Sequence, residues 1–288
     1  MPRADRRRGS AAPLLGLVVL VAVFAVLIKV VMALVDGSSP IQVPVAEQCT
    51  VTVGDVSDSL DLDASENAAV IVAEGMRRGL EPRAASIALA TAMQESKLHN
   101  IDYGDRDSVG LFQQRPSQGW GTVEQIMDPW YSAGKFYDEL VKVPGWQSGD
   151  INDVAQTVQR SGVPDGYRKH VEVAKVWASA LTGHSPASIS CVNRSTATPA
   201  PAVARTVVTK ALGSSVTLTT GQAAVTVNSS DPTSLWAATH LFMMMSKDAG
   251  YQAVAVGQQM WTMNPKELAR WVGAATPKPT EATITLRA

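Results

Sequence analysis

The first apolar stretch of the chain runs from Leu14 to Val35, and Lys29 is its only charged residue. The short segment before it is basic, because it contains Arg3, Arg6, Arg7 and Arg8. About 20 apolar residues span the hydrocarbon core of a bilayer as a helix, and basic residues before such a helix favour a cytoplasmic N-terminus. The pattern therefore predicts a cytoplasmic basic tail at 1–13, a transmembrane helix at 14–35 and extracytoplasmic domains after it. A cleavable signal peptide is the alternative interpretation.

Apolar positions between residues 65 and 183 recur at helical spacing and are separated by polar breaks. Residues of the types that begin helices mark the expected N-termini. These are Ser65, Pro82, Thr122 with Gln125 three residues later, Asp128 before a proline, and Asp150. Residues 65–183 therefore predict an all-α domain, in which residues 99–121 form an irregular loop.

The segments around this domain have no helical period. Residues 36–64 predict a stalk, and residues 184–205 are dominated by Ser, Thr, Ala and Pro, which is the composition of a flexible or extended linker. In residues 206–288, apolar and polar residues alternate on both sides of Gly221, which predicts a β-hairpin. An apolar helix beginning at Asp231 and two further strand patterns follow. They predict a small α/β domain.

Charge and composition narrow the classes of partner. The chain holds 25 basic and 26 acidic residues, a formal net charge of −1, and this balance argues against nucleic acid as a partner. Its four histidines are far apart and match no metal-ligand spacing, so we expect no metal and no cofactor. Binding of a polymer would have to come from a shaped cleft.

The chain has two cysteines, Cys49 and Cys191, which bracket the predicted all-α domain. An even number of cysteines in a compartment that permits disulfides favours a bond between them. Such a bond would close a long loop and restrict the unfolded chain. Two buried free thiols, or pairing with another molecule, are the alternatives.

The most informative polar stretch lies between Met93 and Thr122, where Glu95 ends an apolar helix and a loop rich in Gly, Asp and Ser follows. A partly buried carboxyl keeps its proton more readily than one in water, and it can donate that proton to a leaving oxygen. The alternative for any glutamate near a helix end is a solvated surface group. The residues around Glu95 favour the first interpretation.

Two short motifs lie here, Gln-Glu-Ser at residues 94–96 and Gly-Leu-Phe-Gln at residues 110–113. The first resembles the Glu-Ser motif around the catalytic glutamate of lytic transglycosylases, and the second resembles their Gly-Leu-Met-Gln motif, with Phe in place of Met. The loop also resembles that of goose-type lysozymes. The resemblance implies a mainly α lysozyme-like domain after the transmembrane helix, followed by the small C-terminal α/β domain.

The resemblance implies a set of site residues. Glu95 would be the general acid and base, and Ser96 and Gln113 would contact the sugar. A weaker match covers residues 158–162 and Tyr167, with Gln159 and Arg160 standing where the family carries Tyr and Asn, so Gln159 and Tyr167 join the substrate-binding candidates. From their chemistry alone, further candidates are Gln114 and Arg115 as hydrogen-bond donors and Tyr103 and Trp120 as stacking surfaces.

Asp105 decides between two chemistries. A second carboxylate across the cleft would activate water, as paired carboxylates do in many glycosidases. The alternative is a turn aspartate beside Gly104. If Asp105 only shapes the turn, the resemblance implies that Glu95 also takes back a proton and that a 1,6-anhydro ring closes without water.

These observations predict a membrane-anchored enzyme of the lytic transglycosylase type that cuts peptidoglycan glycan strands, with an envelope assembly as a further candidate partner. A goose-type hydrolase is one alternative. The other is a non-catalytic envelope module that binds glycan or a partner protein.

Overall fold

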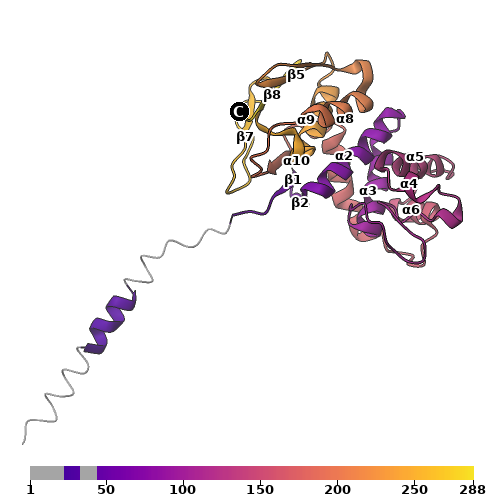
Figure 1. The fold of residues 1–288 in the computed structure, drawn as a ribbon, viewed down its shortest axis with the longest axis horizontal. Coiled ribbons are helices and arrows are strands. Elements are labelled where there is room, and N and C mark those ends of the chain that lie inside the picture. The colour runs from indigo at the N-terminus through magenta and orange to yellow at the C-terminus, as the bar shows by residue number, and fades with distance from the viewer. Residues whose placement is uncertain (1–22, 33–43) are drawn as a thin grey trace, which may run out of the picture. The chain divides into compact units, whose positions relative to one another are not determined.

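The computed structural model describes residues 23–32 and 44–288. Residues 23–32 are helical, and residues 44–288 form one compact unit. Figure 1 shows α3, α4, α5 and α6 at one end of this unit and β5, β7 and β8 at the other. No helix within the described residues is both long and apolar enough to cross a membrane. The tail at 1–13 and most of the predicted span at 14–35 lie outside the described residues.

The helices predicted between residues 65 and 183 are present in the structure. They are α2 (Leu62–Arg77), α3 (Pro82–Ser96), α4 (Val123–Ile126), α5 (Pro129–Leu140), α6 (Ile151–Gln159) and α7 (Val171–Leu181), with short 3-10 turns η1 (Pro116–Gln118) and η2 (Arg168–His170). The predicted capping box of Thr122 and Gln125 is confirmed, as is the Asp128 cap. Ser65 is not a cap, because α2 begins earlier and Asp61 accepts a hydrogen bond from the backbone N–H of Ala64.

A three-stranded antiparallel sheet lies in segments that the sequence predicted to be irregular. Its strands are β1 (Gln48–Val53), β2 (Val56–Asp61) and β3 (Ile189–Val192), in the order β2-β1-β3. Cys49 lies opposite Cys191 in the β1–β3 register, and the two form the predicted disulfide bond. The segment predicted as a stalk at 36–64 therefore contains β1, β2 and the first residues of α2, and the segment predicted as a flexible or extended linker at 184–205 contains β3 and the first residues of α8.

The C-terminal part carries a second antiparallel sheet. After α8 (Ala202–Leu212) and η3 (Gly213–Ser215) come the strands β4 (Thr217–Thr220), β5 (Ala224–Asn228), β6 (Tyr251–Val256), β7 (Gln259–Thr262) and β8 (Glu281–Leu286). Their order in the sheet is β4-β5-β8-β6-β7. The hairpin predicted around Gly221 is confirmed as β4–β5, whereas β7 was not predicted.

Helix α9 (Pro232–Met244), which the short α10 (Ser246–Ala249) follows, joins the two ends of the unit. Every residue of α9 from Leu235 to Met244 is buried, because the helix packs on α2, α7 and α8 as well as on β5 and β8. A helix that is apolar on all sides needs such surroundings. Inside it, the His240 ring lies 2.8 Å (Nδ1) from the carbonyl oxygen of Ala180, and burial lowers the pKa of His240 to about 4.

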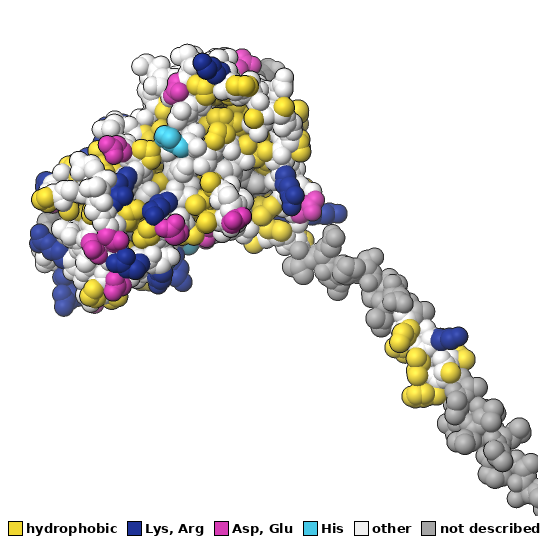
Figure 2. All heavy atoms as spheres, turned by 180° about the vertical axis from the view of Figure 1, so that it is seen from behind, with side chains coloured by type: hydrophobic (Ala, Val, Ile, Leu, Met, Phe, Trp, Pro, Cys, Tyr) yellow, Lys and Arg dark blue, Asp and Glu magenta, His cyan; other side chains and the backbone are white. Residues whose placement is uncertain are grey.

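The predicted fold class is therefore wrong. The helices share one compact unit with two antiparallel sheets, and no transmembrane helix belongs to the part of the chain that the structure describes. Figure 2 shows this unit from the opposite side, where charged side chains of both signs gather over the helical end. The candidate site lies among these helices.

Candidate functional site

Glu95 lies in the last turn of α3, and the chain turns sharply after it. Lys97 and Leu98 both have left-handed backbone conformations, with φ of 54° and 64°, so the helix ends after Ser96. Ser96 is buried, and its hydroxyl donates a hydrogen bond to the carbonyl oxygen of Leu111 at 2.8 Å. This bond ties the end of α3 to the turn at residues 109–114. Ser96 thus connects the end of α3, which carries Glu95, to the turn that carries Gln113.

The Glu95 carboxyl is half-buried and is held by two side chains from later in the chain. The hydroxyl of Tyr167 donates to its Oε1 at 2.6 Å, and the Nε2 amide of Gln159 donates to the same oxygen at 3.3 Å. Gln159 also donates to the carbonyl oxygen of Phe112 at 2.8 Å. Both of these bonds reach Oε1, and no hydrogen bond to Oε2 is recorded among the described residues.

Tyr167 is the firmer of these two partners. Its side chain is completely buried, and burial together with the adjacent Glu95 carboxylate raises the pKa of Tyr167 above its ordinary value. The phenol therefore keeps its proton at any physiological pH and remains a donor to Glu95. The arrangement fixes the direction in which the carboxyl points.

The turn at residues 109–114 depends on glycine. Gly110 has a φ of 78°, and a Cβ there would lie 2.9 Å from the carbonyl oxygen of Ile126, so a larger residue would be both strained and crowded. Gln113 follows with a φ of 48°. Its Nε2 amide donates to the carbonyl oxygens of Tyr103 and Gly110, each at 3.3 Å. Gln113 is thereby held at the rim of the site.

A cleft of about 920 Å³ opens beside Glu95. It is lined by seven of the ten residues that the sequence analysis proposed for catalysis or substrate binding: Glu95, Asp105, Gln113, Gln114, Arg115, Trp120 and Gln159. The other three lie elsewhere. Ser96 and Tyr167 are buried behind Glu95, and the Tyr103 side chain is largely exposed outside the cleft. The structure brings most of the candidates together around one carboxyl.

Asp105 and Asp107 have different surroundings. The Asp105 side chain is 92% exposed, and its one ion pair is a 3.9 Å contact with Arg106. Asp107 instead accepts hydrogen bonds from Arg115 at 2.7 Å and from the backbone N–H of Ser117 at 2.8 Å. The Arg115 guanidinium holds the pKa of Asp107 well below its usual range. Sequence reasoning did not predict that Asp107 would position Arg115.

Backbone strain concentrates at this site. Among the described residues, six that are not glycine have a positive φ, and five of these are at the site. They are Lys97 and Leu98 after Glu95, and Arg106, Gln113 and Arg160 on the cleft wall. Left-handed backbone costs a residue with a side chain about 1 kcal/mol or more, and such residues cluster at functional sites. The strain is independent support for this cleft.

Arg106, Lys135 and Arg160 also line the cleft, and sequence reasoning assigned them no role in binding. Arg160 was noted only as a departure from a family motif, and Arg106 was not singled out at all. Lys135 lies on α5, where nothing in the local sequence signals a site. The feature that sets Arg106 and Arg160 apart is their left-handed backbone, with φ of 59° and 53°, and it is known only from the structure.

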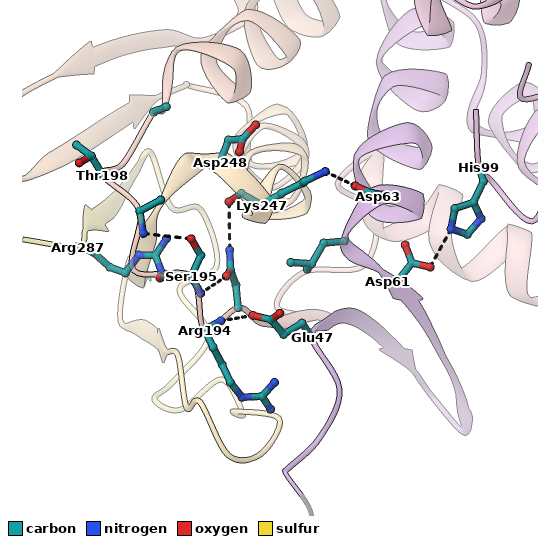
Figure 3. Close-up of a pocket in the computed structure, with 14 residues that line it drawn as sticks. Glu47, Asp61, Asp63, His99, Arg194, Ser195, Thr198, Lys247, Asp248 and Arg287 are labelled. Carbon is teal, nitrogen blue, oxygen red and sulfur yellow. Dashed lines mark hydrogen bonds and ion pairs between the residues drawn. The ribbon is translucent and has the colours of Figure 1, made fainter. Parts of the chain in front are cut away.

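A second cavity, the junction pocket, lies between the N-terminus of α2 and α10 and measures about 720 Å³. Figure 3 shows two contacts between its ionisable side chains, one from Lys247 to Asp63 and one from His99 to Asp61. Lys247 contacts Asp63 at 2.5 Å, and His99 contacts Asp61 at 3.0 Å. Arg287 donates to the carbonyl oxygen of Ser195. These groups already have partners within the protein.

Comparisons with known proteins add no family. No protein-family model matches the chain, and no curated protein does. Within the described residues, no group of three or more His, Cys, Asp or Glu side chains is placed to hold a metal ion. The candidate function therefore rests on the geometry around Glu95 and on its motifs.

Proposed function

We propose that this protein cleaves the glycan strands of peptidoglycan in the manner of a lytic transglycosylase, with Glu95 as general acid and then base. The observation that carries the proposal is the Glu95 carboxyl, half-buried at the wall of a 920 Å³ cleft and held through Oε1 by Tyr167. The motifs at 94–96 and 110–113, which resemble those of the transglycosylases, meet at this point through the Ser96–Leu111 bond. Their meeting in space supports the resemblance.

In the proposed reaction, protonated Glu95 donates its proton to the glycosidic oxygen that leaves, and the bond from that oxygen to the anomeric carbon breaks. The sugar that remains carries positive charge at its anomeric centre. Glu95, now a carboxylate, takes the proton from the C6 hydroxyl of the same sugar as that oxygen bonds to the anomeric carbon. The product is a 1,6-anhydro sugar, and no water is consumed.

This path needs only one carboxylate, which agrees with the surroundings of Asp105. Its side chain is almost fully exposed, and no hydrogen bond within the described residues aims it at Glu95. A base that activates water must be held within reach of that water. The geometry therefore favours ring closure over hydrolysis.

We place this activity outside the cytoplasm. The Cys49–Cys191 bond joins β1 to β3 across 142 residues, and structural disulfides persist in oxidising compartments. Peptidoglycan lies in the same space. The proposed substrate and the redox chemistry of the fold are thus compatible.

The test is to incubate the protein with purified peptidoglycan and to determine the sugar ends of the products by mass spectrometry. We expect anhydro ends, and we expect Asp105→Asn to lower the rate by less than about tenfold, because asparagine also suits the turn. Reducing ends together with a large loss in Asp105→Asn would indicate a goose-type hydrolase. Binding without any cleavage by the wild type would favour a non-catalytic glycan-binding module.

A further inference from the structure

The wall of the Glu95 cleft carries more positive charge than its own carboxylates neutralise. Four basic residues line it: Arg106, Arg115, Lys135 and Arg160. Arg115 is paired with Asp107 at 2.7 Å, but Lys135 and Arg160 form no ion pair in the part of the chain that the structure describes. Arg106 has only its 3.9 Å contact with the exposed Asp105. Three cations thus face the cleft with little or no compensation.

The acidic residues of the cleft do not remove this excess. Glu139 lines the cleft one helical turn after Lys135, and its recorded ion pair is with Lys142 at 2.7 Å. Glu95 accepts its hydrogen bonds from Tyr167 and Gln159, not from a cation. Arg106, Lys135 and Arg160 therefore have no close ion-pair partner among the described residues, although the Lys135 ammonium lies 5.7 Å from the centroid of the Tyr131 ring.

Two of the three basic residues have a left-handed backbone conformation, which is unfavourable for any residue with a side chain. Arg106 has a φ of 59°, and Arg160, which ends α6, has a φ of 53°. Helices that end in this conformation usually carry glycine or asparagine there. The Arg160 side chain gains no hydrogen bond within the described residues that would offset the strain. An arginine at such a position is explained if its guanidinium has a partner outside the protein.

The three cations also come from separate elements. Arg106 lies on the loop after α3, Lys135 on α5, and Arg160 at the end of α6. A ligand in the cleft meets positive charge from more than one wall. Gln113 and Gln114 could bind neutral sugar hydroxyls through hydrogen bonds, and aromatic side chains could stack on sugar rings. Neither contact requires a cation.

We propose that the Glu95 cleft recognises glycan strands whose peptide stems carry free carboxylates, and that Arg106, Lys135 and Arg160 bind those carboxylates. This inference rests on the proposed function, and it specifies which strands the enzyme takes. Guanidinium groups bind carboxylates through paired hydrogen bonds, and lysine supplies a more flexible point charge. Strands stripped of their peptides would lose these contacts but keep those to the sugars.

The experiment measures binding, not cleavage, so that it is separate from catalysis. The Glu95→Gln protein is titrated with three preparations of soluble glycan strands: intact, stripped of peptides by an amidase, and stripped of phosphate polymers by acid. We expect the amidase-treated strands to bind about tenfold more weakly than the intact ones, because charge-assisted hydrogen bonds are lost. Acid-treated strands should bind like intact ones.

Matched variants locate the effect. Arg160→Gln and Lys135→Gln should each weaken binding of intact strands by about fivefold and leave binding of amidase-treated strands unchanged. Arg168 and Lys175 are basic residues outside the cleft. Replacing either one with glutamine should change the affinity neither for intact strands nor for amidase-treated strands. The losses should shrink at high salt, which screens exposed charges.

Equal affinity for intact and amidase-treated strands overturns this inference, and the proposed function still stands if the wild type cleaves both. A loss of affinity that follows removal of phosphate polymers overturns the carboxylate assignment in favour of phosphate. If no strand binds at all and the wild type cleaves none, the inference and the proposed function fail together.

Discussion

The Glu95 cleft and the junction pocket are both polar cavities, yet their charged groups are arranged in opposite ways. In the junction pocket, Lys247 forms an ion pair with Asp63 at 2.5 Å, and the His99 ring lies 3.0 Å from the Asp61 carboxyl. In the cleft, Lys135 and Arg160 have no ion-pair partner among the described residues, and the backbone at Arg160 is strained. Charges that pair across elements hold the fold together, whereas charges left without a partner are available to a ligand.

The contrast extends to the surroundings of the two cavities. The junction pocket lies close to the disulfide, to buried α9 and to Glu66, whose pKa burial and the nearby Asp248 raise to about 7. The cleft lies among helices at the far end of the unit. Changes near the junction should therefore act on stability, and changes in the cleft should act on the reaction.

Removing the disulfide should have the largest effect on stability. Cys49→Ala combined with Cys191→Ala opens a link across 142 residues, for which the chain-entropy model gives on the order of 5 kcal/mol of lost unfolding free energy. Urea unfolding of the variant and of the wild type measures the difference. Cleavage by the folded variant should stay near the wild-type rate, and a loss below about 1 kcal/mol would contradict the role of this link.

Acid should weaken the fold through His240. Its pKa is about 4 in the buried site against 6.5 as a free side chain, so only the unfolded chain takes up the proton between these values. The stability contribution is complete above pH 6.5 and falls by roughly 3 kcal/mol as the pH drops to 4.

The matched variant for this prediction is His240→Asn, which keeps a donor for Ala180 but does not titrate. Its unfolding free energy should fall less between pH 6.5 and pH 4 than that of the wild type. Glu66 acts in the opposite direction, since its raised pKa favours the folded state as the pH falls from 7, and it is present in both proteins. An identical pH dependence of the two would rule out His240 as the cause.

In the cleft, Tyr167→Phe removes the 2.6 Å hydrogen bond to Glu95 but preserves the buried ring. We expect cleavage to slow by about tenfold, because the carboxylate that Glu95 becomes after proton transfer loses a hydrogen bond that stabilises it. Tyr251→Phe is the control, since that buried tyrosine donates to the carbonyl oxygen of Met243 near the junction. Tyr251→Phe should lower the unfolding free energy and leave the rate of cleavage unchanged. A slower rate in Tyr251→Phe together with an unchanged rate in Tyr167→Phe would contradict the contrast between the two regions.

The smallest effect should come from Asp63→Asn in the junction pocket. The Lys247–Asp63 pair is about half exposed on both sides, and such pairs contribute about 1 kcal/mol or less. Urea unfolding at low and high salt should show a small loss that salt reduces further. A loss of several kcal/mol would mean that the pocket is more than a set of surface pairs.

The elements that were predicted correctly depend on local chemistry. The caps at Thr122 and Asp128 and the hairpin around Gly221 are set by residues a few positions apart. The three-stranded sheet was missed because β1 pairs with β3 at a distance of about 140 residues, which no local pattern reveals. The sequence predicted an apolar helix beginning at Asp231 but assigned it to a separate C-terminal domain, whereas α9 packs against helices of the N-terminal part as well.

The same distinction applies to the site. Glu95 and Gln113 were predicted because each lies in a short motif. The contact between Tyr167 and Glu95 spans 72 residues, and its donor role follows only from the fold. Lys135 and Arg106 lie in no motif, and the role that we propose for them depends on their position in the folded cleft and on the absence of a close ion-pair partner.

The central claim is that Glu95, and not the junction pocket, carries the chemistry, and one measurement compares them directly. The release of sugar fragments from purified peptidoglycan is followed with the wild type, Glu95→Gln and Asp63→Asn at equal concentration of folded protein. We predict that Glu95→Gln is at least about 100-fold slower, since general acid catalysis is worth that much, while Asp63→Asn matches the wild type. Equal rates for Glu95→Gln and the wild type would contradict the assignment of Glu95.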